Sequence, residues 1–433
     1  MKSIHPINSS SRDPYCFTRF LYILEAAFEY FINLLLTGAY LAKVAGAIGL
    51  SDSTTGIVTS IVSLGTSFQL FAVFLSHRTP VKRWVTVGHM LNQLLLACVW
   101  LTPLIPVGTN AKAALFIGFL LIGYAINHVI NSPKISWYMA MVRDDARGCF
   151  TAKKEMVSLI GGAQFTFLLG NIFDFLEAAG KQRSAFLVGA FTLLLLAILH
   201  TLTLLLSKEK SVGRGSVSNG GHEMRELFRN RSLLVVILVG VLYSTANGIS
   251  YSFYGTYQIN ELGFSMSFIA LQGILYTIVR CTASIWLGRY ADRHSFAAML
   301  RISFGMLFFG ELVMTFTVPA NGRILYSIYY TFFYAVFGAG YTNGMMNLTY
   351  DTVERSQRVG AFALYNGACG IVGFLASVLG SSVVSAVQQR GNRLLGHTVY
   401  AQQLLSLIAA VLIGALWLVL LVGFRTEKNG RDS

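Results

Sequence analysis

The stretch SKEKSVGRGSVSNGGHEMRELFRNR, from Ser207 to Arg231, contains six basic residues, several Gly and Ser, and no apolar run. On both sides of it, from about residue 17 to 206 and from about residue 232 to 424, the chain consists of long apolar segments. We count six such segments in each part. The pattern predicts two six-helix bundles joined by a charged linker, with boundaries at 1–206, 207–231 and 232–433.

The composition indicates a membrane protein. Hydrophobic residues make up 54% of the 433 residues and charged residues only 12%, about half the charged fraction of a soluble domain. Because backbone groups in lipid must satisfy their own hydrogen bonds, the apolar segments are expected to be helices. The fold class is therefore an all-α polytopic membrane protein. The net charge of +14 is explained by basic cytoplasmic loops rather than by a nucleic-acid partner.

The predicted spans set the orientation of the chain. Lys and Arg number 24 on one set of loops and tails and 6 on the opposite set. The positive-inside rule then places both termini and the central linker in the cytoplasm. Most spans exceed the ~20 residues needed to cross the hydrocarbon; they lie near 18–44, 53–76, 84–105, 112–138, 153–176, 184–207, 232–257, 264–288, 298–318, 323–350, 359–386 and 399–424.

No sequence motif points to catalysis. The five cysteines form no CxxC pair, and the chain has no GxxxxGK[ST] or HExxH motif. We therefore expect no enzymatic activity, no cofactor, no disulfide framework and no metal site.

The two parts of the chain show internal similarity. Gly56-Ile57 recurs as Gly273-Ile274, and Gly123-Tyr124 as Gly340-Tyr341, each 217 residues later. Repeated halves with a substrate site between them are a frequent plan of secondary transporters. The sequence thus favours a duplicated, pseudo-symmetric molecule.

The segment GRYADRHS, residues 288–295, stands between the eighth and ninth predicted spans. It resembles the G-x-x-x-D-R/K loop of the major facilitator superfamily. The counterpart in the first half departs from that pattern, because Val73 replaces the glycine and His77 the aspartate. The segment 137–154 is also similar to loops of many bacterial members. With the six-plus-six layout, the resemblance covers essentially the whole chain but identifies no subfamily.

The resemblance has three implications. The first, fourth, seventh and tenth helices line a central cavity. The protein works by alternating access, exposing that cavity to one side of the membrane at a time. A cytoplasmic gating loop closes the inner side when the protein is open outward; its residues are Gly288, Arg289, Asp292 and Arg293.

Carboxylates at membrane depth are expensive and mark functional sites. Glu25 and Glu29 are four residues apart, so they share one face of the first helix, which continues with Asn33. Their mutual repulsion and their burial favour a protonated, neutral form of at least one of them. The pair suits a proton carrier or a site for a cationic group of the substrate.

Polar residues on the other cavity helices are further candidates for solute binding or proton coupling. His128 near mid-depth is either a group that titrates near neutral pH or a simple interhelical hydrogen-bonding residue. The helical spacing groups the candidates of each span on one side: Tyr124, Asn127, His128, Asn131, Lys134 and Tyr138 in the fourth, Tyr243, Asn247, Tyr251, Tyr254 and Gln258 in the seventh, and Tyr330, Tyr334, Tyr341 and Asn347 in the tenth.

Arg280 is the one basic residue within the eighth predicted span. A guanidinium at membrane depth needs a partner or a wet cavity. The partner is either a carboxylate of this chain, Glu311 or Glu29, or an anionic group of the substrate. We favour the internal pair with Glu311, which equally needs a partner.

These observations favour a secondary active transporter for a small-molecule solute. The protein is expected to be a monomer in the lipid bilayer of the cell membrane. The paired glutamates favour proton coupling. An exporter of amphipathic compounds, or a transporter-like sensor that binds solute without moving it, remains the alternative.

Overall fold

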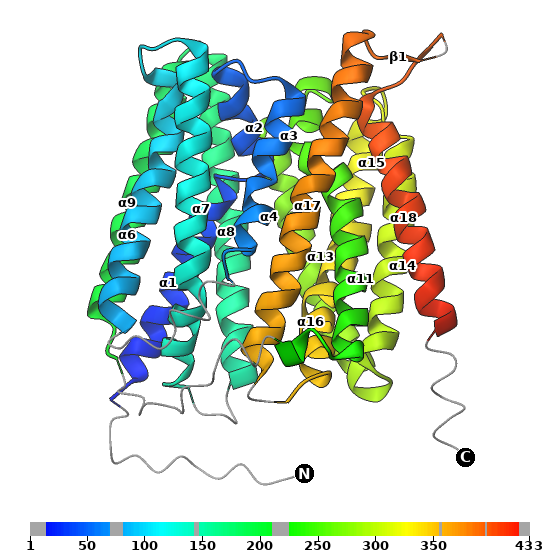
Figure 1. Cartoon of the computed structure of the whole chain (residues 1–433). Coiled ribbons are helices and arrows are strands. Elements are labelled where there is room, and N and C mark those ends of the chain that lie inside the picture. The colour runs from blue at the N-terminus through cyan, green and yellow to red at the C-terminus, as the bar shows by residue number, and fades with distance from the viewer. Residues whose placement is uncertain are drawn as a thin grey trace.

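The computed structural model describes residues 14–69, 81–142, 147–209, 225–354, 357–394 and 396–423. Long helices running side by side make up most of this part of the chain (Figure 1), so the predicted all-α class is confirmed. The first part contains α1 (Cys16–Leu34), α2 (Gly38–Ala47), α3 (Asp52–Thr59), α4 (Ile61–Thr66), α6 (Val81–Leu101), the short 3₁₀ turn η1 (Thr102–Leu104), α7 (Thr109–Met139), α8 (Arg147–Ala178) and α9 (Gln182–Leu206).

The second part is also helical, apart from one short hairpin. Its strands β1 (Arg393–Leu394) and β2 (His397–Thr398) pair in antiparallel fashion at the tip of the molecule. Its helices are α11 (Arg231–Ser250), η3 (Tyr251–Phe253), α12 (Tyr254–Thr256), η4 (Tyr257–Glu261), α13 (Met266–Arg293), α14 (Phe296–Thr315), α15 (Gly322–Ile328), η5 (Tyr329–Tyr334), α16 (Ala335–Asp351), α17 (Arg358–Gln389) and α18 (Ala401–Gly423).

The helices are consistent with twelve spans. Among the described residues, nine helices are long and apolar enough to cross a membrane, and the bent pair α1–α2 makes ten. The predicted span 323–350 coincides with the helical run from Gly322 to Asp351. The predicted span 53–76 begins with α3 and α4, but residues 70–80 lie outside the described part. The predicted first span, 18–44, is two helices with a bend of 45° between α1 and α2.

The outer surface of the bundle is apolar, as a lipid-facing surface must be. Leu168, Phe175, Phe191 and Leu379 each expose more than 60% of their surface. In a soluble protein so many exposed large hydrophobic side chains would indicate an aggregation liability. Here they are consistent with lipid contact around the helices.

Helices α1–α9 contact mainly one another, and helices α11–α18 form a second group. The linker between them includes residues 210–224, which lie outside the described part, so the boundaries at 206 and 231 stay a prediction. Both α1 and α18 have their terminal ends at the same end of the bundle (Figure 1). We call the opposite end, where α3 and α13 begin, the distal end.

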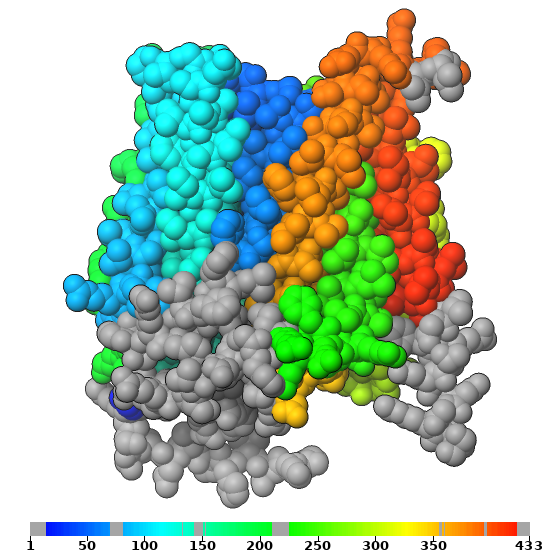
Figure 2. All heavy atoms as spheres, viewed as in Figure 1, coloured from blue at the N-terminus to red at the C-terminus, as the bar shows by residue number. Residues whose placement is uncertain are grey.

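The two groups meet through α8 with α13, α3 and α4 with α17, and α2 with α12. Figure 2 shows α17 lying directly against α3 and α4 on one face of the molecule. Near the distal end, Asp174 of α8 accepts hydrogen bonds from the backbone N–H groups of Met266 and Ser267 at 2.9 and 2.8 Å. A carboxylate of one group therefore caps the N-terminus of a helix of the other, where the helix dipole favours an anion.

Glycines allow the close approach of the two groups. A Cβ atom on Gly255 of α12 would lie 2.5 Å from the carbonyl oxygen of Gly38, and one on Gly370 of α17 would lie 2.3 Å from the carbonyl oxygen of Ser63. Both obstacles are backbone atoms of the first group. Any larger residue would push the groups apart at these contacts.

The second group contains irregular helical segments that include or adjoin buried polar residues such as Ser250 and Gln258. The seventh span passes from α11 through the 3₁₀ turn η3 to the π-helix η4, and the tenth contains the π-helix η5. π-Helical segments are rare and often occur at functional sites. They turn the side chains that follow them to new directions, which matters for the tyrosines described below.

Candidate functional site

A lysine lies between the two glutamates of α1. The Nζ atom of Lys134 on α7 is 2.7 Å from Oε1 of Glu25 and 2.5 Å from Oε2 of Glu29. The spacing of four residues stacks the carboxylates on one side of α1, as predicted, and α7 brings the ammonium group to both. Attraction to Lys134 thus offsets part of the repulsion between the two carboxylates.

Two histidines extend this cluster and were not anticipated. Nε2 of His200 on α9 lies 2.8 Å from Oε1 of Glu25, and both side chains are fully buried. The ring of His89 on α6 is 5.0 Å from that of His200. Both histidines stand in apolar stretches of the sequence, where only their polarity at membrane depth could have identified them.

The cluster also has the donor atoms of a cation site. Ligand atoms of Glu25, Glu29 and His200 lie within 4.8 Å of one another. The ammonium group of Lys134 already contacts both carboxylates, so a metal ion would have to displace it. The geometry suits two carboxylates that share one ammonium group better than a metal centre.

Exposure differs between the two glutamates. The side chain of Glu25 is 0% exposed and that of Glu29 is 20% exposed. Glu29 is therefore the member of the cluster that water or a solute can reach, and Glu25 is its buried partner.

Arg280 of α13 forms a pair across the two groups of helices. Its Nη2 atom lies 3.5 Å from Oε1 of Glu155 on α8, and its Nη1 donates to the Tyr276 hydroxyl at 2.8 Å. The arginine side chain is 20% exposed and the glutamate 47%. The expected pairing of Arg280 with Glu311 is wrong, because another carboxylate of this chain, Glu155, is its partner.

Tyrosine rings surround this pair on the side of the second group. The ring of Tyr276 stacks on Tyr330 at 4.9 Å, Tyr330 on Tyr334 at 5.9 Å, and Tyr334 on Tyr251 at 5.2 Å. Two of these tyrosines belong to the π-helix η5 and one to the 3₁₀ turn η3. These stacked rings form a wall of aromatic faces next to a guanidinium group. The wall can bind the apolar or ring face of a solute, and the guanidinium group can bind its polar groups.

Glu311 of α14 lies apart from Arg280, in a shell of hydroxyl groups. Its carboxylate accepts hydrogen bonds from Tyr254 at 3.0 Å, Ser250 at 3.3 Å and Tyr329 at 3.4 Å. Tyr254, predicted to face the cavity, is therefore buried against this carboxylate. Its exposed fraction is 3%.

The other candidates of the fourth helix are near α4. The ring of His128 and the Cβ atom of Tyr124 lie against Gly65 of α4, and Asn127 is buried. Asn131 and, on α1, Asn33 are half-buried. His128 and Tyr124 thus lie against α4, a helix that also contacts α17 of the second group.

The remaining candidates of the seventh and tenth spans contact one another. The ring of Tyr243 is 4.3 Å from that of Tyr341, and its hydroxyl donates to Asn247 at 3.3 Å. The hydroxyl of Tyr341 lies 2.9 Å from that of Tyr365 on α17. They form a second tyrosine cluster, nearer the end that carries the termini.

The predicted gating loop is helical. Gly288, Arg289, Asp292 and Arg293 belong to the last turns of α13, which ends at Arg293. The turn is limited to His294 and Ser295, and the side chain of Ser295 caps α14 by accepting from the Ala298 N–H at 3.1 Å. Ser295, and not the nearby carboxylate of Asp292, therefore caps α14. Asp292 itself is exposed, and the corresponding segment of the first half, 73–80, lies outside the described residues.

Comparisons with known proteins agree with this architecture. The family model described as "Major Facilitator Superfamily" matches residues 20–377 and 236–433. No curated protein matches the chain.

Solved structures share the fold. A bacterial homolog of the human lysosomal transporter Spinster, in an inward-facing and unoccupied conformation, aligns with a TM-score of 0.69 at 11% identity, over 96% of this chain and 98% of that one. The nucleoside transporter NupG aligns with a TM-score of 0.65 at 15% identity, over 94% and 98%. A D-xylose–proton symporter aligns with a TM-score of 0.64 at 15% identity, over 92% and 97%.

Identities this low establish the fold and leave the substrate undetermined. The family model, in contrast, extends over nearly the whole chain. This chain therefore belongs to the major facilitator superfamily of membrane transporters.

Proposed function

We propose that this protein is a proton-coupled secondary transporter that moves a small polar solute by alternating access. The observation that supports it best is the cluster of Glu25, Glu29 and Lys134. Two carboxylates and one ammonium group leave one negative charge in a largely buried place when His200 is neutral. A single proton neutralises that charge, and burial makes such neutralisation favourable.

The accessible carboxylate, Glu29, is the proposed proton acceptor. When it is protonated, Lys134 keeps only Glu25 as an ionic partner, so the link between α1 and α7 changes with each proton bound. A change of packing between cavity-lining helices can favour opening to one side of the membrane over the other. Proton binding and access are thereby linked through Lys134.

The proposed solute site lies between Glu155 and Arg280, next to the wall of tyrosines. The pair is long, at 3.5 Å, and its glutamate is 47% exposed, so a solute can replace one ionic partner without leaving a buried charge unpaired. Polar groups of the solute bind Arg280 or Glu155, and its ring or apolar face lies on Tyr276 and Tyr330. Because each group of helices contributes one of these two charged residues, the affinity for the solute depends on the relative position of the groups.

The test uses Glu29→Gln, which imitates the protonated side chain and preserves its shape. The purified protein is reconstituted in vesicles and offered a panel of radiolabelled solutes, including nucleosides and D-xylose, with and without a pH gradient. We expect the variant to lose accumulation driven by the pH gradient while it retains solute exchange. Should the solute be cationic, the variant instead weakens its binding. Glu177→Gln, which removes the exposed partner of Lys43, is the matched control.

Wild-type accumulation by the Glu29→Gln protein would contradict the proposal and direct attention to His128. Solute binding without time-dependent accumulation would indicate a sensor, and accumulation only in the outward direction would indicate an exporter. Each alternative thus has its own signature in the same assay.

We further propose the cell membrane as the location, with both termini in the cytoplasm. The excess of Lys and Arg on the side of the termini supports this orientation. Single cysteines at Gln182 and Asn392 should react with an impermeant reagent from outside the cell, and one at Asn219 only after the membrane is opened. The reverse pattern would disprove the orientation.

A further inference from the structure

The hydroxyl shell of Glu311 continues toward the distal end through α18. The Oγ atoms of Ser250 and Ser406 lie 3.2 Å apart, and the amide of Gln402 donates to Ser250 Oγ at 3.0 Å. Gln402 is only 2% exposed. Its carbonyl oxygen, Oε1, is buried without a hydrogen-bond partner among the described residues. A buried acceptor left unpaired costs free energy, so it calls for a donor such as water.

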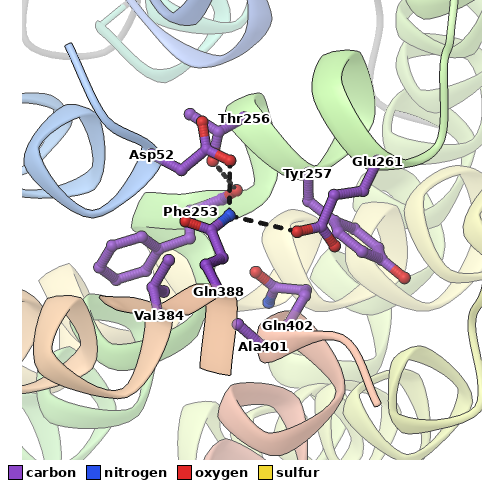
Figure 3. A pocket seen from close by; sticks show the side chains of 9 residues that line it. All are labelled: Asp52, Phe253, Thr256, Tyr257, Glu261, Val384, Gln388, Ala401 and Gln402. Carbon is purple, nitrogen blue, oxygen red and sulfur yellow. Dashed lines mark hydrogen bonds between the residues drawn. The ribbon is translucent and has the colours of Figure 1, made fainter. Parts of the chain in front are cut away.

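Gln402 also lines a small cavity, shown in Figure 3, whose residues come from both groups of helices. Asp52 lines the cavity from the first group, and Glu261, Gln388 and Gln402 line it from the second. We call it the Gln402 cavity. It offers about 10 Å³ to the centre of a water molecule, which is room for roughly one water.

The outer wall of the cavity is a polar contact between the two groups. The amide of Gln388 donates to Asp52 at 2.8 Å and to Glu261 at 3.3 Å, as the dashed lines in Figure 3 indicate. Asp52 also accepts from Asn260 at 2.6 Å. Oε2 of Glu261 is a second buried oxygen without a partner in the described part of the chain. Separation of the groups at the distal end would break the Asp52 contacts and open the cavity.

We propose that Glu311 is a second proton-binding site of this protein, and that protons reach it from the distal end through the Gln402 cavity. The inference rests on the proposed function, since a proton site is useful to a transporter driven by protons. It adds a site in the second group of helices, far along the chain from Glu29, and a route by which that site is filled.

The groups around Glu311 support a proton rather than a metal ion. The carboxylate accepts hydrogen bonds from three hydroxyl groups at 3.0 to 3.4 Å. A hydroxyl group can donate to the ionised carboxylate and accept from the protonated acid, so the same shell suits both states of a proton site. The titratable groups that face it are hydroxyls: Tyr254 of α12, Tyr329 of η5 and, further along α11, Tyr243. Helix α18, which packs on α14, carries no charged residue. At the cavity, the titratable groups are Asp52, Tyr257 and Glu261.

The transfer itself needs only hydroxyl groups that donate and accept. Ser250 gives its O–H proton to Oε2 of Glu311, and its Oγ takes the proton of the Ser406 hydroxyl. Ser406 in turn takes a proton from a hydronium ion in the Gln402 cavity, and that ion becomes water. One O–H bond breaks and one forms at Ser250, and the net change is one proton moved from the cavity to the carboxylate. Gln402 holds the water through its free carbonyl and orients the serines through its amide.

The site lies where the irregular helices meet. Ser250 is the last residue of α11, directly before η3, and Tyr329 is the first residue of η5. The same two segments carry Tyr251 and Tyr334, which belong to the tyrosine wall. A change in the charge of Glu311 alters its hydrogen bonds to Ser250 and Tyr329. Because these residues adjoin or belong to η3 and η5, the change can shift Tyr251 and Tyr334 at the proposed solute site.

Infrared difference spectroscopy of the full chain in lipid, without solute, tests the proposal. On going from alkaline to acid pH, the wild type should gain the C=O stretching band of a buried carboxylic acid, and Glu311→Gln should lack it. Tyr254→Phe should shift the band, because it removes one donor to the same carboxyl group. If Glu311→Gln fails to fold, the shift in Tyr254→Phe still identifies the band.

The route is tested by transfer into deuterated water, which shifts the band as the acid proton exchanges. Gln402→Met should slow this exchange by an order of magnitude or more and leave the amplitude of the band unchanged. Gln403→Met, at the next residue and bonded instead to the Thr315 carbonyl, should exchange as fast as the wild type. Equal exchange in Gln402→Met and wild type would overturn the route.

If the carboxylic acid band persists in Glu311→Gln, Glu311 is not the proton-binding group. If the band depends on sodium concentration instead of pH, the site binds a metal cation and not a proton. Neither result touches the proposed function, which is judged separately by the loss of pH-driven accumulation in Glu29→Gln. Loss of accumulation in Glu29→Gln together with a normal band at Glu311 would support both.

Discussion

The ammonium group of Lys134 lies 2.7 Å from the carboxylate of Glu25, with both side chains almost completely buried between α7 and α1. Burying two charges costs more than a surface pair would, and the cost is offset only while both partners are present. Because Glu29 shares the same ammonium group at 2.5 Å, the cluster links the stability of the first group of helices to its charge state.

Lys134→Met should strongly destabilise the protein. It leaves Glu25 buried as a negative charge with His200 as its remaining partner, and removing one member of a buried pair typically costs about 3–5 kcal/mol. Thermal unfolding in detergent measures the effect. The double variant Lys134→Met with Glu25→Gln should recover most of the loss. Lys43→Met, which breaks a pair whose glutamate is 52% exposed, should cost less than about 1 kcal/mol, and equal losses in the two single variants would contradict this account.

Asp174→Ala should favour separation of the two groups at the distal end. It removes both hydrogen bonds from the carboxylate to the N-terminus of α13, and loss of such a cap is worth about 1 kcal/mol. That energy corresponds to roughly a fivefold change in the ratio of closed to open molecules. Spin labels at Gln182 and Gln389, both exposed at the distal end, report the separation. Glu177→Ala on the same helix should leave the distance distribution as in the wild type.

Gly255→Ala should open the distal end more strongly than Asp174→Ala. The added Cβ atom would lie 2.5 Å from the backbone oxygen of Gly38, and backbone atoms cannot move aside as the end of a side chain can. The same spin-label pair measures the outcome. Gly273→Ala is the control, because a Cβ atom there meets nothing within 4 Å and alanine favours the helix. If the distal end stays closed in Gly255→Ala, the close contact between Gly255 and Gly38 does not hold the two groups together.

Asp292→Asn should slow or bias the exchange between the two access states and leave solute binding almost unchanged. The residue is exposed in the last turn of α13, away from the Arg280 pair, so its charge acts on the end of the bundle that carries the termini. Equilibrium binding and the rate of exchange, measured on the same vesicles, separate the two effects. Abolished binding in a folded Asp292→Asn protein would rule out a role confined to gating.

The sequence alone determined the class of this protein. A chain with 54% hydrophobic and 12% charged residues can satisfy its backbone in lipid only as a helical bundle. The long apolar segments then predicted twelve spans, and one motif, GRYADRHS, indicated the superfamily to which the chain belongs. The four-residue spacing also stacked Glu25 and Glu29 correctly, because neighbours on a helix face are fixed by local geometry.

Only the tertiary structure decided which residues from different helices meet. Lys134 and Glu25 are 109 positions apart, and Arg280 and Glu155 are 125 positions apart, so no local rule connects them. Arg280 was expected to pair with Glu311 in preference to Glu29 or a substrate anion, because Arg280 and Glu311 both needed partners. Hydroxyl groups, which carry no charge, bind Glu311 instead. The irregular helices η3 and η5 likewise arise from packing between spans, since long apolar and aromatic stretches are equally compatible with a regular helix.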